Sequence, residues 1–504
     1  MTPLSALPMP VTPNGGDLIG LLPEIILGGA FVLLMLLDTI TAATKRNWLA
    51  ALTVVALLSS LGAVIYGWFD AATARSVYFG AFAYDRFGLF IDGILLVTAI
   101  LAVVISPGYL NRRGAHYGEY YSLIVAATTG MMLMAGSSSL MTIFLSLEIL
   151  SIALYILSGF ARQEERSQEA AVKYLLLGGF ASGFLLFGMA LVYGETGHTQ
   201  LEQIALAVGK GAMGSDPLLY GGIILMFVGF AFKISAAPFH TWTPDVYQGA
   251  PTSVTAFMSV ATKVAAFAAL IRVFTFTLPT LYSHWSTVVL TVAILSMVIG
   301  NVVALAQTSL KRMLAYSGIA QAGYILIGVS VPPGGDNSGT IGSLYYLAAY
   351  SITNLGAFAV LTLMSGRGED LDNYDSIRGL ASRRPYVAAL MAWFLLSLGG
   401  FPPTAGFFGK FLVFTAAVKL GNVPLALWGV ATSAVSVFYY LRVALLMYSP
   451  AADGREQYRW SRSTVSGSLV LAVSGVGTLA LGVAVFLIYS IAQSAVPPHG
   501  ILLG

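Results

Sequence analysis

The chain has 504 residues, of which 57% are hydrophobic and only 9% are charged, and its mean hydropathy is +0.82. A soluble domain carries about a quarter charged residues, so this composition excludes an ordinary soluble protein and indicates a membrane protein with many spans. The net charge of +3 gives no basis for nucleic-acid binding, and the lack of cysteine excludes disulfides, thiolate iron–sulfur sites, c-type haem and cysteine-bound zinc.

Fourteen windows of about 20 mainly apolar residues, the length that crosses a bilayer, recur along the chain with short polar breaks. They cover residues 18–37, 48–69, 87–106, 117–136, 139–160, 168–194, 217–240, 251–275, 285–307, 311–331, 341–365, 385–415, 422–448 and 465–492. The first is expected to be a permanent span, because the preceding MTPLSALPMPVTPNGGD lacks the basic region of a secretory signal. The expected fold class is therefore an all-α polytopic membrane protein of about fourteen transmembrane helices.

Lysine and arginine are unevenly distributed between the loops that join these windows. Fifteen lie in the odd-numbered loops, whereas the even-numbered loops hold four, or five if Arg272 at a helix end is counted. Cytoplasmic loops carry the excess of positive residues. The sequence therefore predicts that both termini face away from the cytoplasm.

No soluble domain is expected between the spans. The longest polar stretch is residues 366–385, which we assign to a cytoplasmic loop. Residues 199–213 predict an amphipathic helix that lies at the membrane interface, because its apolar residues repeat at helical spacing. The residues on that face are Leu201, Ile204, Ala205 and Val208.

Among the charged residues that fall within the expected spans, one glutamate and four lysines are singled out: Glu148, Lys173, Lys233, Lys263 and Lys410. A charge at the centre of a membrane helix costs about 2.5–3.5 kcal/mol on insertion scales, so each needs a partner or water. Two interpretations follow: structural ion pairs between helices, or a hydrated internal path along which lysines exchange protons. The excess of four lysines over one glutamate favours the proton path. Burial disfavours a charged lysine and a nearby carboxylate favours it, so a changing distance between Glu148 and Lys233 would make a proton switch.

Proline interrupts two of the spans that carry a lysine. Pro238 follows Lys233 in KISAAPFH. Pro402 and Pro403 precede Lys410 in GGFPPTAGFFGKF. Proline frees backbone carbonyls, and irregular backbone at membrane depth needs surrounding protein or a water-filled cavity. Interrupted spans in both halves of a chain are typical of inverted-repeat transporters with a site at the repeat interface.

Several further polar residues are candidates for lesser roles. His240 lies beside the first break, about two helical turns beyond its lysine, and we predict a relay role for it over that of a core histidine. Glu24 and Asp92 are also candidates, but both lie near span ends, where a solvated or capping carboxylate is the alternative. Lys311 and Arg312 are expected to fix orientation and to reach the interface. With five histidines in the chain, no metal site is predicted.

Four strings resemble the antiporter-like membrane subunits of respiratory complex I. They are RSQEAAVKYLLLGG (166–179), KISAAPFHTWTPDVYQGAPTSVTAFMSV (233–260), SLKRMLAYSGIAQAGYILIG (309–328) and GGFPPTAGFFGKF (399–411). The likeness runs from about residue 20 to about residue 450. It is similar in particular to the subunit N type of NADH-quinone oxidoreductase and to subunit 2 of the cyanobacterial and chloroplast NAD(P)H-quinone oxidoreductase.

The resemblance implies two inverted five-helix repeats, helices four to eight and nine to thirteen, with helices seven and twelve discontinuous. The corresponding segments are an N-terminal three-helix segment at 1–116, a first repeat at 117–275, a second repeat at 285–448, and a C-terminal helix and tail at 465–504. It also places the family's functional glutamate of helix five at Glu148. The functional lysines of helices six, seven, eight and twelve fall at Lys173, Lys233, Lys263 and Lys410. A lysine on helix twelve is typical of subunit N.

The function implied is proton translocation coupled to electron transfer from NADH to quinone on other subunits. This subunit would be a non-redox part of the translocase. NADH, FMN, iron–sulfur clusters and quinone are expected on partner subunits, with no cofactor in this chain. The expected partners are other antiporter-like and small hydrophobic membrane subunits, in a bacterial inner membrane, with a thylakoid membrane as the lesser alternative.

Two other functions remain open on the sequence. A subunit of a multisubunit cation/proton antiporter would share the broken helices and the lysines. A structural membrane scaffold would use the buried charges only as ties between helices. A sodium-translocating variant fits less well, because sodium prefers oxygen ligands to a row of lysines.

Overall fold

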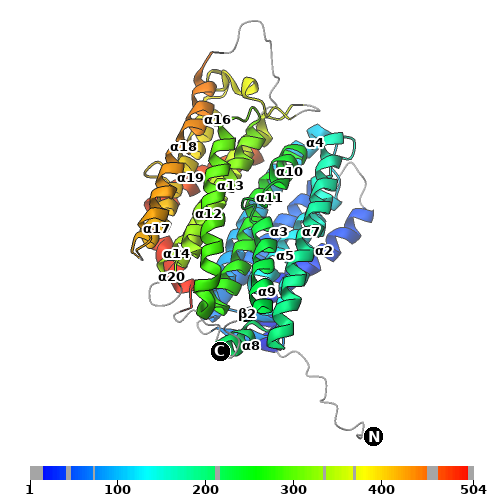
Figure 1. Ribbon diagram of the computed structural model, residues 1–504. Coiled ribbons are helices and arrows are strands. Elements are labelled where there is room, and N and C mark those ends of the chain that lie inside the picture. Colours follow the sequence, from blue (N-terminus) through cyan, green and yellow to red (C-terminus); the bar gives the residue numbers. More distant parts are fainter. Residues whose placement is uncertain are drawn as a thin grey trace, which may run out of the picture.

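The computed structural model describes residues 15–40, 47–71, 74–209, 216–332, 337–366, 370–419, 421–450 and 464–497. Most of the described residues lie in helices, which run side by side in Figure 1. Helices from the first half of the sequence, blue to green, stand next to those from the second half, green to red. The all-α membrane fold predicted from the composition is confirmed.

The first half of the chain contains α1 to α11 and a short hairpin. The bounds are α1 Gly15–Gly20, α2 Leu22–Ile40, α3 Asn47–Asp70, β1 Arg75–Val77, β2 Phe82–Tyr84, α4 Arg86–Arg113, α5 Glu119–Gly136, α6 Leu140–Ser158, α7 Glu165–Thr196, α8 Leu201–Gly209, α9 Pro217–Lys233, α10 Trp242–Gly249 and α11 Thr252–Leu270. A π-helical turn, η3 Ile271–Thr277, continues α11, so the two form one long element.

The second half of the chain begins after this element. The bounds are η4 Pro279–Leu281, α12 Tyr282–Leu305, α13 Leu310–Val329, α14 Ser338–Met364, η5 Tyr374–Ile377, α15 Leu380–Arg383, α16 Pro385–Gly399, α17 Ala405–Lys419, α18 Val423–Tyr448, α19 Val465–Val483 and α20 Val485–Ala495. Every residue of α11 is buried, and α4, α5, α9 and α14 pack around it, so this helix forms the centre of the molecule.

Each of the fourteen apolar windows coincides with one helix or with two helices in succession. Ten of the described helical elements are long and apolar enough to cross a membrane, whereas α9, α16 and α20 are shorter. The count of fourteen spans, the inverted repeats and the four segment boundaries remain predictions.

The two proline-containing spans are broken where the sequence indicates. Helix α9 ends at Lys233, and an irregular segment that contains Pro238 leads to α10. Helix α16 ends at Gly399, and Gly400 adopts the left-handed conformation (φ 88°) that closes the helix before the two prolines. Both lysines that accompany these breaks therefore lie next to free helix ends.

A hairpin and a surface helix mark one end of the bundle, here called the hairpin end. Strands β1 and β2 pair antiparallel, with Arg75 opposite Tyr84. Helix α8 lies at the same end, because Gln200 and Ser139 form a bridge next to it and Gln200 donates to the carbonyl of Phe79 in the hairpin (2.8 Å). Helix α8 covers residues 201–209 of the amphipathic helix expected at 199–213, with Leu201, Ile204 and Val208 buried and Ala205 half-buried, and residues 210–213 lie outside the described part of the chain.

The opposite end carries the basic loops and is called the basic end. Some residues on which the orientation argument depends lie outside the described part of the chain, namely Lys45, Arg46, Lys210, Arg367, Arg455, Arg459 and Arg462, together with residues 1–14. Among the described basic residues, Arg113 pairs with Glu164 and Arg162 pairs with Glu119. Loops distant in the sequence therefore meet at this end.

The interpretation of Lys311 as a residue that reaches the interface is wrong. Its side chain is only 1% exposed, and its ammonium donates to Asp370 (3.0 Å) and to the carbonyl of Ala250 (2.8 Å). Asp370 also accepts from Thr252 Oγ1 (2.7 Å) and from Tyr109 Oη (3.1 Å). This carboxylate therefore joins α4, α11 and α13 at the basic end.

Asp370→Asn is expected to destabilise the protein by about 2–3 kcal/mol at pH 7. Burial alone would raise the pKa of the Asp370 carboxyl, but the charges of Lys311 and Arg113 lower it to about 2. An unperturbed aspartate titrates near pH 4. Because the folded-state pKa lies below the unfolded one, the stabilisation is complete above about pH 4 and is lost as the pH falls toward about 2.

The measurement is the unfolding temperature of the chain in its purified complex, for wild type and variant, from pH 8 to pH 3. The difference in unfolding temperature between wild type and variant should be constant above about pH 5 and should become smaller below about pH 4. A difference that is independent of pH across this range would contradict the role given to Asp370.

Candidate functional site

Lys233 occupies the last turn of α9, at the first break. Its side chain is 3% exposed, and its ammonium donates to Ser151 Oγ of α6 (2.7 Å). The same ammonium lies over the rings of Tyr155 (5.5 Å) and Tyr174 (5.6 Å). Aromatic faces stabilise a cation at such distances, so the lysine is held by a neutral hydroxyl and two rings.

Glu148 lies on α6, three residues before Ser151 and thus on the same face of that helix. It lies within electrostatic range of Lys233, but the two side chains form no ion pair in the structure. Its Oε1 atom is buried and has no hydrogen-bond partner. The predicted pair is therefore close, with Ser151 as the group that bonds the lysine directly.

Lys263 lies in the middle of α11 and is fully buried. Its ammonium donates to Tyr247 Oη of α10 (3.1 Å). Gly318 of α13 lies against it, because a Cβ atom at that position would come within 3.3 Å of Lys263 Nζ and within 3.0 Å of Tyr350 Oη. Because Gly318 has no side chain, α13 can lie close to Lys263.

Lys410 lies on α17, just after the second break, and is 4% exposed. Its ammonium donates to the last carbonyls of α16, those of Leu398 (2.9 Å) and Gly399 (3.1 Å), and to Ser433 Oγ (2.8 Å). The last carbonyls of a helix lack partners within the helix and carry partial negative charge. The break therefore supplies the acceptors that hold this ammonium.

A group of polar side chains lies between Lys263 and Lys410. Gln321 of α13 donates to the carbonyl of Leu398 (3.1 Å), which Lys410 also binds, and to Tyr440 Oη (3.3 Å). Tyr346 donates to the Gln321 side-chain oxygen, and Ser317 bonds Tyr440. This group was not predicted from the sequence, although a glutamine within the apolar run AYSGIAQAGYILIG indicates a polar position inside a span.

Lys173 differs from the other three lysines, and the expectation that it is buried in its span is wrong. It lies two turns from the start of α7, and its side chain is 40% exposed. It pairs with Glu169 (2.6 Å) and with Asp245 of α10 (2.8 Å), which also binds Arg312 (2.6 Å). These residues line a polar pocket of about 280 Å³ at the basic end, together with Arg166, Ala170, Gln248 and Gly249.

His240 lies in the irregular segment between α9 and α10. Its Nδ1 atom is buried and has no hydrogen-bond partner, and its ring packs edge-on against Tyr316 (6.3 Å between centroids). The structure thus places the histidine beside the break, as expected. Its relay role remains a prediction.

Comparison with known proteins gives a consistent result. Residues 137–436 match the family described as NADH:quinone oxidoreductase/Mrp antiporter, TM. The chain is 44% identical over 476 residues to NADH-quinone oxidoreductase subunit N of Trichlorobacter lovleyi, covering 94% of this chain and 96% of that protein. The chain belongs to this family. It is also 42% identical over 428 residues to NAD(P)H-quinone oxidoreductase subunit 2 of Thermosynechococcus vestitus, covering 85% of this chain and 81% of that protein.

Solved structures extend the comparison to the fold. A chain of respiratory complex I from Thermus thermophilus is 33% identical, with a TM-score of 0.79, and the match covers 94% of this chain and all of that one. A chain of the Mrp complex from Dietzia sp. is 20% identical, with a TM-score of 0.80, covering 95% and 96%, and shows the fold alone. The resemblance to antiporter-like complex I subunits is therefore confirmed.

This complex I-type subunit also contains a buried group of charges that the sequence analysis did not recognise. Arg272 of η3 is fully buried, and its guanidinium donates to both carboxylate oxygens of Asp85 (2.8 Å each). Asp85 lies between β2 and α4 and also caps α4 by accepting from the Gly88 amide (2.8 Å). Arg272 was considered only as a residue at a helix end, and the structure places it inside the protein.

Of the two interpretations of Glu24 and Asp92, that of solvated carboxylates is wrong. Glu24 is 8% exposed and Asp92 is 3% exposed. Each has one buried oxygen atom without a hydrogen-bond partner, Oε2 of Glu24 and Oδ1 of Asp92. Both residues lie near helix starts, as the sequence indicated, but the neighbouring helices cover them.

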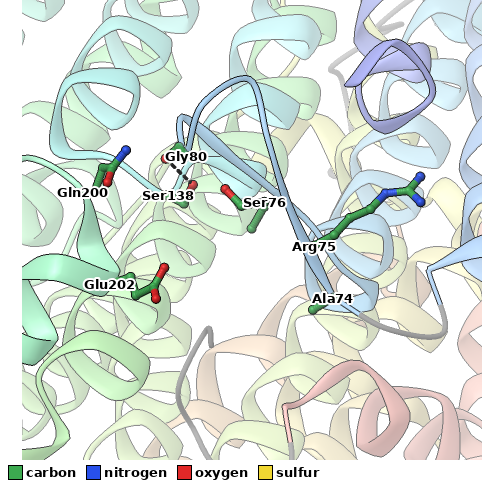
Figure 2. Close-up of a pocket in the computed structure, with 8 residues that line it drawn as sticks. Ala74, Arg75, Ser76, Gly80, Ser138, Gln200 and Glu202 are labelled. Carbon is green, nitrogen blue, oxygen red and sulfur yellow. Dashed lines mark hydrogen bonds between the residues drawn. The ribbon is translucent and has the colours of Figure 1, made fainter. Parts of the chain in front are cut away.

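A second pocket, of about 310 Å³, lies beside the hairpin of this complex I-type subunit (Figure 2). It is lined by Ala74, Arg75, Ser76, Gly80, Ala83, Ser138, Gln200 and Glu202. Ser138 Oγ donates to the Gly80 carbonyl (2.9 Å), which joins the hairpin to the segment before α6. None of the six predicted site residues lines this pocket, so it is separate from the lysines.

Proposed function

We propose that this chain translocates protons as a non-redox subunit of an NADH:quinone oxidoreductase, through a row formed by Glu148, Lys233, Lys263 and Lys410. One observation carries the proposal. The three lysines are buried, and within the described residues none of them forms an ion pair with a carboxylate. Each binds only neutral groups, which are hydroxyls or backbone carbonyls.

This arrangement favours proton exchange over the structural scaffold. A buried ion pair that serves as a tie between helices needs both partners, because an unpaired buried charge is costly. Elsewhere in this chain such ties are present, as at Arg272 with Asp85 and at Lys311 with Asp370. The three lysines of the row have no such carboxylate partner. This supports the interpretation that each of them gains and loses a proton in turn.

The row can be followed from one lysine to the next through polar groups. From Lys233 it passes the break, where buried atoms without protein partners include Glu148 Oε1, Tyr174 Oη, His240 Nδ1 and Thr243 Oγ1. Buried polar atoms ordinarily have a partner, and internal water binds those that have none in the protein. Water at the break would connect Lys233 and His240 to Tyr247, which binds Lys263. From Lys263 the path continues to the carbonyl that Lys410 binds, by way of Ser317, Tyr440 and Gln321.

We assign proton uptake to the polar pocket beside Lys173. That pocket contains both signs of charge and lies at the basic end. The next residue, Tyr174, stacks on Trp242 (4.5 Å between centroids) and lies under the ammonium of Lys233. The pocket is therefore separated from the row by one layer of aromatic side chains. In this proposal Lys173 and Asp245 collect protons, and Lys233 receives them.

We place both termini on the non-cytoplasmic side of a bacterial inner membrane, with the basic end in the cytoplasm. The absence of cysteine allows a direct test with single introduced cysteines. A membrane-impermeant maleimide added to intact cells is expected to label Glu202→Cys, exposed at the hairpin end, and not Gln163→Cys, exposed at the basic end. The reverse pattern would contradict the orientation.

A cation/proton antiporter subunit is the second candidate, and the description of the matched family favours it, because that description names the Mrp antiporter beside NADH:quinone oxidoreductase. The two functions differ in partners, since NADH, FMN, iron–sulfur clusters and quinone would be carried by the other subunits of an oxidoreductase. The test is to extract the native complex in mild detergent and to identify the co-purifying subunits by mass spectrometry. Iron–sulfur and flavin subunits would support the oxidoreductase. Only hydrophobic antiporter subunits, without iron–sulfur proteins, would replace it with the antiporter.

A further inference from the structure

A further pocket, of about 420 Å³, lies between α3, α4, α14, α19 and α20, and none of the six predicted site residues lines it. Apart from the indole of Trp68, its only polar side chains are those of Thr98 and Ser351. Each hydroxyl already donates to a carbonyl of its own helix, Thr98 to Ile94 (2.8 Å) and Ser351 to Leu347 (2.6 Å). The pocket therefore offers an occupant apolar contact along its length.

This pocket opens to the outside of the molecule. Val97 of α4 is 38% exposed, and Gly93 and Ile94 beside it are half-buried. Helix α14 is buried at every position except Ala348 and Ile352, and both of these residues line the pocket. The helices α3, α4, α14 and α19 are all long and apolar enough to cross a membrane. The medium that meets α14 through this opening is therefore the hydrocarbon of the bilayer.

The length of the pocket corresponds to one leaflet of the membrane. Its α4 residues recur at helical spacing between Leu89 and Leu101. These twelve steps along a helix span about 18 Å. The hydrocarbon core of a bilayer is about 30 Å thick, so each leaflet contributes about 15 Å. An extended lipid chain of one leaflet can therefore lie along the whole pocket.

A cation lies at the end of the pocket nearest the hairpin. Arg86 begins α4, one turn before Phe90 and on the same face. Its Nε atom donates to the carbonyl of Trp68 (3.2 Å), and its guanidinium lies over the ring of Trp68 (5.5 Å), which lines the pocket. Tryptophan and arginine at the end of a span mark the level of the lipid headgroups.

The charge of Arg86 is not compensated within the part of the chain that the structure describes. Its neighbour at the same end, Arg75, pairs with Asp70 (3.0 Å), whereas Arg86 makes no ion pair with a carboxylate there. Its hydrogen bond to Trp68 uses Nε and leaves the two terminal amino groups. These groups match the geometry of a phosphate.

We propose that this pocket binds an acyl chain of a phospholipid whose phosphate is held by Arg86. The headgroup lies at the hairpin end, and the chain runs along α4 toward the middle of the bilayer, where it contacts Ile352 of α14. An anionic lipid such as phosphatidylglycerol is favoured over zwitterionic phosphatidylcholine, because its headgroup keeps a net negative charge beside the guanidinium. A free phosphate ion would leave the apolar part of the pocket empty.

This lipid site goes beyond the proposed function and does not depend on it. It requires only that the chain lies in a membrane. A complex with inactive lysines would still bind the lipid, and a complex with an active lysine row could equally lack it. The two proposals therefore fail in different measurements.

The test is photo-crosslinking of the purified complex in phosphatidylcholine vesicles that contain phosphatidylglycerol with a diazirine in one acyl chain. The labelled residues are identified by mass spectrometry. We expect label on Val97 and Ile352 that persists when more unlabelled phosphatidylcholine is added. Label on Leu176, which is 66% exposed on α7, should fall in proportion to the dilution.

Gly93→Leu is expected to abolish the persistent label on Ile352. A Cβ atom at Gly93 would have no neighbour within 4 Å, so the larger side chain fills the pocket without a clash. Gly179→Leu is the matched control, because Gly179 of α7 has equally open space around its Cβ position and does not line the pocket. This variant should label like the wild type.

Arg86→Gln is expected to weaken the preference for phosphatidylglycerol over phosphatidylcholine by about five-fold, the effect of one basic residue near an anionic headgroup. Arg75→Gln removes a positive charge at the same end and should leave the preference unchanged. The preference is measured from the label on Ile352 with the diazirine on either lipid. This comparison leaves the pocket intact, so it decides the proposal even if Gly93→Leu fails to assemble.

Three results would overturn the proposal. Label on Ile352 that is diluted as readily as label on Leu176 would show ordinary boundary lipid in place of a bound one. The absence of label from both Val97 and Ile352 would show that a partner subunit covers the pocket. An equal preference for the two lipids in the wild type would remove Arg86 as the group that holds the headgroup.

Discussion

Lys233→Met is expected to stop proton translocation through this subunit while the complex still assembles. Methionine is only one atom shorter than lysine and can still pack against Tyr155 and Tyr174, but it carries no proton. A positioned proton-transfer group typically contributes roughly 10²- to 10⁴-fold to a rate. The variant should therefore lower the rate of protons moved by this route by about 100-fold or more, and the number of protons moved per electron pair should fall.

The measurement is the proton-to-electron ratio of the complex reconstituted in vesicles, with electron transfer followed in parallel. Lys419→Met is the matched control, because Lys419 is exposed at the end of α17 and should leave the ratio unchanged. An unaltered ratio in Lys233→Met, at normal assembly, would reject the lysine row. A reduced amount of assembled subunit in both variants would instead point to a defect of folding.

The sequence was informative wherever a residue conflicts with its immediate surroundings. A lysine in an apolar window is recognisable without any structure, and Lys233, Lys263 and Lys410 are buried as expected. The helix breaks were recognisable for the same reason, since proline and glycine act on the local backbone. Lys173 was misjudged because its window was drawn as one apolar run, although the polar first turns of α7 extend to it.

The partners of these lysines could not be predicted. Ser151 lies 82 residues before Lys233, Tyr247 lies 16 residues before Lys263, and Ser433 lies 23 residues after Lys410. Which side of each helix faces which neighbour depends on how the helices rotate and pack. A serine or tyrosine in a membrane helix gives no sign in the sequence that it will meet an ammonium.

The distribution of charges along the sequence does not predict which basic residues near helix ends are buried. Lys311 and Arg272 lie where a solvent-facing residue is expected, yet both are buried. The carboxylate that binds Arg272 comes from 187 residues earlier in the chain, and the one that binds Lys311 comes from 59 residues later. The hairpin escaped prediction as well, because two strands of three residues lie in a short loop between apolar windows.

Arg272→Met is expected to increase local unfolding at the hairpin end of the protein. The variant leaves Asp85 buried without its cation, next to Asp92, and breaking a buried pair in this way costs about 3–5 kcal/mol. Arg272 also donates to the carbonyl of Ala135, so η3, α4 and the end of α5 lose a common contact. Hydrogen exchange of the backbone amides in η3 and at the start of α4 should become roughly 10²- to 10⁴-fold faster.

Two further variants distinguish the loss of the buried Arg272–Asp85 ion pair from the loss of a positive charge in general. Arg75→Met removes an exposed pair with Asp70 at the same end, where both side chains are over one-third exposed, and such pairs contribute only about 0–1 kcal/mol. The double variant Asp85→Asn/Arg272→Met should recover much of the lost protection, because asparagine can still accept from the Gly88 amide and no unpaired charge remains. If Arg272→Met accelerates exchange no more than Arg75→Met does, the buried pair does not hold this end together. If the double variant is as open as the single one, the guanidinium contributes through its contact with Ala135 and not through its charge.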